Sequence, residues 1–351
     1  MQPDPRSDPR PDPQPYAAPW WLPGAQSQTI FPALRHPESA PAYARERWDA
    51  PRHQGHADFI DVDWVNKAAL ADPGRPLLVL FHGLEGSSQS HYARAVMNAV
   101  ARRGWVGAVP HFRGCSGEPN RAPRFYHSGD SAEIGWMLER FRREHGGAND
   151  ARRPFYAAGV SLGGNALLRF LGEQGSAAGF VDAAAAISAP LDLAAGGAAL
   201  SQGFNMVYTR MFLKTLKRKC EIKLQQFPGL FDAQAMRSSR DLYEFDNVVT
   251  APLHGYRDTD DYWRRASSLP ILGEIRVPTL VLNARNDPFQ PARALPRPQS
   301  TDGKGNGWIG QVRIEQPAHG GHVGFMRGAL PLAGRIDWLP RRILDFAAGH
   351  G

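Results

Sequence analysis

Short, continuous apolar runs alternate with segments of helical periodicity through the middle of the chain. An unbroken apolar run is typical of a strand that is covered on both faces. Apolar residues at three-to-four spacing are typical of helices that rest on such a sheet. The alternation predicts an α/β fold with a mostly parallel sheet and helices on both faces. The predicted strands are 76–81, 105–109, 155–160 and 181–188, and the predicted helices are 91–103, 131–144 and 166–171.

The chain before residue 76 has a different pattern. Proline-rich repeats dominate its beginning, where nothing can be buried, so residues 1–18 are expected to form a disordered tail. Residues 28–32 are predicted to be an extended arm packed on the body. Residues 45–49 are predicted to form a strand, and residues 57–65 alternate between polar and apolar positions like a half-solvated antiparallel strand.

The strand–helix alternation stops after residue 190 and resumes near residue 271. We interpret residues 191–270 as a helical cap inserted into an α/β core of residues 19–190 and 271–351. Inserted segments of this kind usually cover a substrate pocket. The cap is predicted to contain helices 204–224 and 258–267, and the core is predicted to end with strands 277–283 and 311–315 and helix 335–347.

Composition and charge narrow the classes of function. The net charge is only +7, and no zinc spacing, phosphate-binding glycine loop or basic–aromatic pattern is present, so we expect no metal, no cofactor and no nucleic-acid partner. With no secretory signal, no membrane-spanning run and two cysteines, a cytoplasmic protein is expected. The basic run Lys214 to Lys223 is interpreted as a solvated helix face, with weak contact to an anionic membrane surface as the alternative. The oligomeric state stays open.

The stretch Gly159-Val160-Ser161-Leu162-Gly163 lies between a predicted strand and a predicted helix. In such a nucleophile elbow, the serine occupies a strained backbone position that lifts its hydroxyl clear of the sheet. The residues two before and two after it must lack a bulky side chain, which Gly159 and Gly163 satisfy. Ser161 is therefore the predicted nucleophile, whereas the alternative is an incidental serine in a glycine-rich turn.

A serine nucleophile needs a base and a third group that orients the base, each on a loop after a strand. Asp287 follows the strand at 277–283 and is the predicted acid, although a turn aspartate before proline is common. Asp192, after the strand at 181–188, is the rival acid. Its alternative, structural role is to cap the start of the inserted helical segment. His322, flanked by glycines, is the predicted base, and His319 is its competitor.

The tetrahedral intermediate of acyl transfer needs two backbone donors aimed at its oxyanion. One is predicted to be the amide of Leu162, directly after the nucleophile. The other is predicted to be the amide of Leu84, in the loop after the strand at 76–81, where Gly83 permits close approach. His82 in this loop is interpreted as a structural brace.

The chain contains a set of motifs at 82–88, 112–117, 126–129, 159–165, 286–289 and 320–325, with further ones at 28–30 and 208–219. Together these stretches resemble the YheT-like branch of the α/β-hydrolases. The resemblance covers nearly all of the chain after residue 19 and implies a serine hydrolase with Ser161, Asp287 and His322 as its triad. Family members are treated as carboxylesterase-like, and eukaryotic relatives include lipid and phospholipid hydrolases. The chain departs from the family pattern at Gln26, where histidine is frequent.

These observations predict a carboxylic ester hydrolase that acts on a small-molecule ester or a lipid through an acyl-enzyme on Ser161. A lipid, phospholipid or thioester hydrolase with the same triad is the alternative within that class. A binding module that retains the hydrolase fold without catalysis is the alternative of another class. The acyl length and the leaving alcohol stay open.

Overall fold

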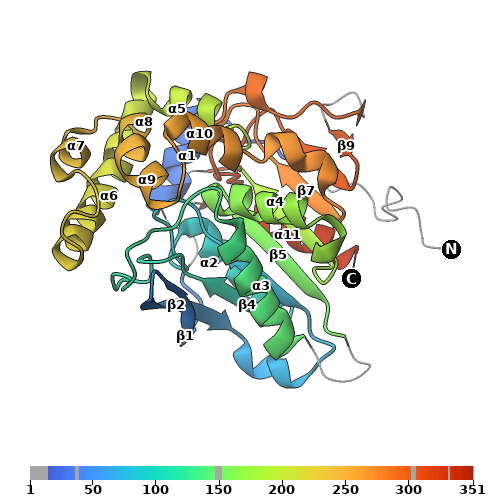
Figure 1. Ribbon diagram of the computed structural model, residues 1–351. Helices are drawn as coiled ribbons and strands as arrows, with labels where there is room; N and C mark the ends of the chain where they lie inside the picture. The colour runs from blue at the N-terminus through green and yellow to red at the C-terminus, as the bar shows by residue number, and fades with distance from the viewer. Residues whose placement is uncertain (1–14, 36–38, 147–151, 302–305, 331–332, 351) are drawn as a thin grey trace.

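The computed structural model describes residues 15–35, 39–146, 152–301, 306–330 and 333–350. Within them, a single ten-stranded sheet forms the centre of the molecule, in the order β1-β2-β4-β3-β5-β6-β7-β10-β9-β8 (Figure 1). The strands from β4 to β10 in this order are parallel, and antiparallel strands extend both edges. The strands are β1 Ala44–His53, β2 His56–Val65, β3 Leu77–Phe81, β4 Val106–Pro110, β5 Phe155–Val160, β6 Ala183–Ile187, β7 Thr279–Leu282, β8 Ser300–Thr301, β9 Gly307–Ile309 and β10 Val312–Glu315.

Helices cover both faces of the sheet. Helices α3 and α4 pack on one face over a core that includes Phe141 and Leu168, and α2 and α11 pack on the other over a core that includes Val96 and Leu344. Figure 1 shows α3 and α4 in front of the sheet and α2 and α11 behind it. The predicted α/β class and the central strands are therefore confirmed. These four helices are α2 His91–Arg102, α3 Ser131–His145, α4 Leu162–Gln174 and α11 Trp338–Ala348.

The prediction of an extended arm at residues 28–32 is wrong. These residues belong to helix α1, Gly24–Arg35, which contains Pro32. Proline removes the amide that would bond the Gln28 carbonyl within the helix. That carbonyl instead lies against Gly324, where an added Cβ would approach it to 1.9 Å. Tertiary contact with the loop around Gly324 therefore outweighs the local signal of β-branched residues and proline.

The N-terminal end of the described chain also packs on the body. The hydroxyl of Tyr16 donates to the carbonyl of Met326, and its ring packs edge-on against Phe325. The predicted tail therefore has an ordered portion at Tyr16. Its residues 1–14 lie outside the described part of the chain.

Between β6 and β7 the chain is helical, in keeping with the helices expected there. Figure 1 shows these helices gathered above one end of the sheet. Within the described ranges, no helix is both long and apolar enough to cross a bilayer. The longer helices of this segment are α5 Leu193–Leu200, α6 Met206–Gln226 and α10 Thr259–Ala266, and the shorter ones are α7 Ala233–Ser238, α8 Leu242–Phe245 and α9 Ala251–Leu253, with the single turns Gly203–Asn205 and Asp246–Thr250 beside them.

The interpretation of Lys214 to Lys223 as a solvated face is wrong for part of the run. Lys223 is buried and donates to the carbonyls of Asn120 and Ala122. Lys219 also points inward and is paired with Glu85 at 2.6 Å. Each of these two ammonium groups donates to oxygen acceptors, which offsets its loss of hydration.

Candidate active site

Ser161 lies at the junction of β5 and α4 with a left-handed backbone, φ 52° and ψ −121°. A Cβ at Gly159 would lie 2.5 Å from the carbonyl oxygen of Gly163, and a Cβ at Gly163 would lie 2.5 Å from the carbonyl oxygen of His82. Both contacts are too short for any other residue, so this turn requires both glycines. The turn has the strand, strained serine and helix that the sequence pattern indicates.

The structure brings His322 between Ser161 and Asp287. Its Nε2 lies 3.0 Å from the Ser161 hydroxyl oxygen, and its Nδ1 lies 2.8 Å from Asp287 Oδ2. Because a carboxylate accepts only, Nδ1 carries the proton and Nε2 is left to accept from the serine. The backbone amide of Phe289 donates to the second carboxylate oxygen, which orients Asp287. The arrangement can transfer the serine proton to the imidazole.

The rival residues lie elsewhere. The Asp192 carboxylate accepts from the amide of Ala195 and caps the start of α5, which was its expected structural role. His319 is exposed at the surface.

The loop that carries His322 bends through left-handed residues at Gly321 and Val323. The ring of Phe289 stacks on the His322 imidazole with 4.1 Å between the ring centroids.

Helix α1 braces the His322 loop, a role that the sequence reasoning missed. The Thr29 hydroxyl oxygen accepts from the His322 amide at 2.9 Å. The Gln28 side-chain oxygen accepts from the amide of Gly320 and from the side chain of Asn286, each at 2.9 Å. The only available signal was that residues 28–30 belong to the stretches that resemble the YheT-like branch.

The predicted oxyanion donors border the pocket in front of Ser161, since both Leu84 and Leu162 line it. Leu162 is the first residue of α4, where the amide has no partner within the helix. A Cβ added at Gly83 would lie 3.1 Å from the Cβ of Ser161, so the loop after β3 passes directly beside the nucleophile.

His82 has the bracing contacts that were expected of it. Its Nδ1 donates to the carbonyl of Gly83, and its Nε2 accepts from the amide of Phe112. The side chain is fully buried, and this burial lowers its pKa to about 3. The neutral imidazole therefore joins the loop after β3 to the loop after β4.

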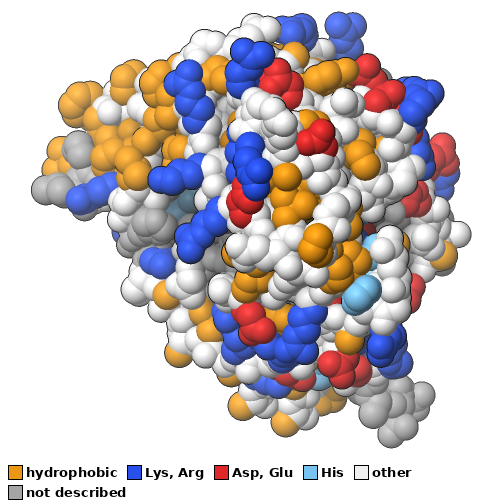
Figure 2. Space-filling model, turned by 60° about the vertical axis from the view of Figure 1, so that its left-hand side comes forward, with side chains coloured by type: hydrophobic (Ala, Val, Ile, Leu, Met, Phe, Trp, Pro, Cys, Tyr) orange, Lys and Arg blue, Asp and Glu red, His pale blue; other side chains and the backbone are white. Residues whose placement is uncertain are grey.

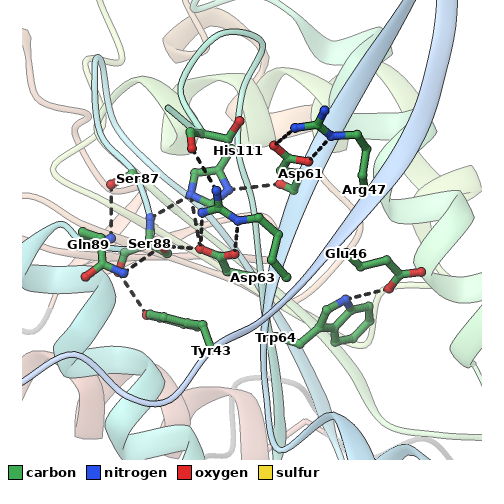
Figure 3. A network of polar contacts seen from close by, with 12 residues as sticks. Tyr43, Glu46, Arg47, Asp61, Asp63, Trp64, Ser87, Ser88, Gln89 and His111 are labelled. Atoms are coloured by element: carbon green, nitrogen blue, oxygen red, sulfur yellow. Dashed lines mark hydrogen bonds and ion pairs between the residues drawn. The ribbon is translucent and has the colours of Figure 1, made fainter. Parts of the chain in front are cut away.

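A polar network holds the far end of the same loop (Figure 3). The Ser88 hydroxyl donates to Asp63 at 2.6 Å, and its amide donates to Nε2 of His111 at 3.2 Å. The Tyr43 hydroxyl donates to the carbonyl of Ser88. Burial raises the pKa of Asp63, but its hydrogen bonds with the paired Arg45 and with Ser88 lower the pKa, so that it lies below its usual value. Two antiparallel edge strands thus anchor the loop that approaches Ser161.

The pocket in front of Ser161 is mostly apolar, and helices between β6 and β7 contribute much of its wall. Asp246 is an exception: its oxygens accept from the Thr250 hydroxyl and the Trp263 indole, and burial raises its pKa to about 6. No cluster of three His, Cys, Asp or Glu side chains able to hold a metal occurs in the described ranges. Apolar lining residues include Leu84, Phe212, Leu216, Phe245 and Phe289.

Comparisons with known proteins agree with this architecture. A family model described as the alpha/beta hydrolase fold matches residues 76–329. The esterase YheT of Escherichia coli (strain K12), so named provisionally, is 43% identical over 82% of this chain and 81% of its own length. The mouse phospholipase ABHD3 is 31% identical over 78% of this chain, and the match spans 64% of that protein, less than two thirds of its length.

The solved structures show the same fold. An esterase of Pyrococcus furiosus matches 90% of this chain and 99% of its own with a TM-score of 0.50 and 15% identity. At that identity, the match shows the fold alone. Family membership rests instead on the family model and on the 43% identity to YheT. This chain belongs to the α/β-hydrolase family, in its YheT-like branch.

Proposed function

We propose that the protein hydrolyses carboxylic esters through an acyl-enzyme on Ser161. The observation that carries this proposal is the position of the His322 imidazole, 3.0 Å from the Ser161 hydroxyl and 2.8 Å from the Asp287 carboxylate. Proton abstraction by a positioned imidazole converts a weakly nucleophilic hydroxyl into an effective one. Asp287 keeps the imidazole in the tautomer that leaves Nε2 free to accept.

The reaction has two halves. In the first, Ser161 Oγ attacks the ester carbonyl carbon while His322 takes its proton, and the amides of Leu84 and Leu162 bind the resulting oxyanion. The bond from carbonyl carbon to alcohol oxygen then breaks, and the imidazolium returns the proton to the leaving alcohol. In the second, water loses a proton to His322 and attacks the acyl-enzyme. The carboxylic acid leaves, and Ser161 recovers its proton.

The pocket and the relatives support an ester or lipid as the substrate class. Apolar side chains line most of the space in front of Ser161, which favours the acyl chain of an ester or a lipid. Relatives of this chain are named as an esterase, a phospholipase and a monoacylglycerol lipase. We further propose that residues 191–270 act as a cap over this pocket. A thioester of similar acyl chain is the alternative substrate within the same mechanism.

The test is hydrolysis of p-nitrophenyl esters of graded acyl length. Ser161→Ala is expected to lower kcat/KM by about 10⁴-fold or more. Ser238→Ala is the matched control, because this exposed serine on α7 bonds only to nearby backbone carbonyls. Equal rates for wild type and Ser161→Ala would contradict the proposal. So would failure of a fluorophosphonate probe to label Ser161 in the folded protein.

A further inference from the structure

Helix α6 presents two opposite faces. One face lines the pocket through Phe212, Leu216, Lys219 and Cys220. The other is open to solvent, and its members fall within an arc of roughly 100° when α6 is drawn at 100° per residue. With Phe204 from the preceding turn, we call the set the outer face of α6: Phe204, Val207, Arg210, Met211, Lys214 and Arg218.

The apolar members of the outer face are unusually exposed. Phe204, Val207 and Met211 are 53%, 41% and 63% exposed. They are three of the seven large hydrophobic side chains that stand out in this way among the described residues. Figure 2, which turns the left-hand side of Figure 1 forward, shows hydrophobic side chains gathered at the upper left with Lys and Arg side chains beside them. Contiguous apolar side chains on a surface favour contact with a partner.

The cations of the outer face are not paired with acidic side chains in the described part of the chain. Arg210, Lys214 and Arg218 are exposed, and in the described part of the chain no ion pair or side-chain hydrogen bond engages them. Lys217, another lysine of α6, instead donates hydrogen bonds to the backbone carbonyls of Arg237 and Ser239. The face ends at Glu221, which is paired with Arg237. The unpaired charge is therefore positive throughout the outer face.

We propose that the outer face of α6 docks the protein on an anionic lipid surface. Apolar side chains flanked by unpaired cations match the boundary between acyl chains and anionic head groups. The same helix forms a wall of the pocket on its other side, so docking would place that wall next to the source of a lipid substrate. This consequence rests on the proposed function, whereas the docking itself is independent of catalysis.

The test is co-sedimentation with vesicles. Wild-type protein is expected to sediment with phosphatidylcholine vesicles that contain roughly one third phosphatidylserine, and to stay in solution with pure phosphatidylcholine. Binding is expected to weaken as the salt concentration rises from about 0.1 M to 0.5 M. Lys214→Glu combined with Arg218→Glu is expected to lower the partition coefficient by about tenfold or more, and Val207→Ser with Met211→Ser by a similar factor.

The matched control is Arg102→Glu with Arg143→Glu, which makes the same change in net charge on exposed residues. These two residues lie in the last turns of α2 and α3, just before β4 and β5 begin, whereas Ser161 follows the end of β5. They are therefore at the opposite end of the parallel strands from Ser161. The control is expected to bind like wild type, and the thermal midpoint of every variant checks its folding. If wild type stays in solution with anionic vesicles, or if the control loses binding equally, the docking proposal is overturned.

Ser161→Ala separates this proposal from the proposed function. It is expected to bind vesicles like wild type while it loses ester hydrolysis. An inactive wild-type protein that still binds through the outer face would end the catalytic proposal alone. A wild-type protein that hydrolyses esters but does not sediment with anionic vesicles would end the docking proposal alone.

Discussion

The hydroxyl oxygen of Thr29 accepts a hydrogen bond of 2.9 Å from the backbone amide of His322, although 293 positions separate the two residues. The same hydroxyl donates to the carbonyl of Ala25, which fixes it within α1. The N-terminal helix therefore holds the loop of the proposed base at its central residue. Sub-ångström placement of an imidazole relative to its nucleophile has large effects on rate.

Thr29→Val should lower kcat for a p-nitrophenyl ester by about tenfold or more and leave KM nearly unchanged, because the proposed base loses its anchor but the pocket does not. Thr29→Ser should restore most of the activity, since it keeps the accepting oxygen. Thr215→Val makes the same change at an exposed threonine on α6 that bonds only to the nearby carbonyl of Phe212. A loss of activity in Thr215→Val equal to that in Thr29→Val would remove the positioning role.

Gly159→Ala should destabilise the protein by about 1–3 kcal/mol or more, because its Cβ would lie 2.5 Å from the backbone oxygen of Gly163. Backbone atoms of the elbow cannot move aside as a flexible side chain can. Gly273→Ala is the matched control, since its Cβ would meet no atom within 4 Å. Urea unfolding of both variants measures the difference, and similar midpoints would show that the elbow tolerates a side chain.

Asp246→Asn should lower KM for an ester with an apolar acyl chain by about fivefold at pH 8, which corresponds to roughly 1 kcal/mol. Burial raises the pKa of Asp246 to about 6, so its carboxyl is neutral below that pH and charged above it. A charged carboxylate in an apolar pocket opposes binding of an acyl chain. In wild type, KM should therefore rise as the pH passes 6, and in Asp246→Asn it should not. A KM profile that is the same for both proteins would contradict this.

His82 should make folding stability fall at acid pH. Its pKa is lowered from 6.5 to about 3 by burial in the folded protein, so the unfolded chain binds the extra proton between these values. Stability is then fully present above about pH 6.5 and decreases as the pH falls toward 3. His82→Gln should be less stable at pH 7, and its stability should fall less over that range. Urea unfolding at several pH values gives both slopes, and equal slopes would assign the acid sensitivity to other groups.

Much of the fold could be read from the sequence because its signals are local. The apolar run at 76–81 and the helical spacing at 131–144 depend on neighbouring residues only, and both appear within a residue of their predicted bounds. The final helix begins at Trp338 rather than at Arg335, because Arg335 pairs with Arg327 in an isolated bridge. Such a pairing leaves no periodicity in the sequence.

The sequence by itself determined the order of the central strands and of the helices that cover them, the elbow around Ser161, and the loops that carry Asp287 and His322. Only the tertiary structure decided that residues 28–32 are helical, that Lys219 and Lys223 turn inward, and which distances join Ser161, Asp287 and His322. The physical reason is the range of the interactions. Backbone preference and hydrophobic period act over a few residues, whereas a carbonyl that accepts from a buried lysine, or a threonine that bonds a loop 293 positions away, exists only after the chain has closed on itself.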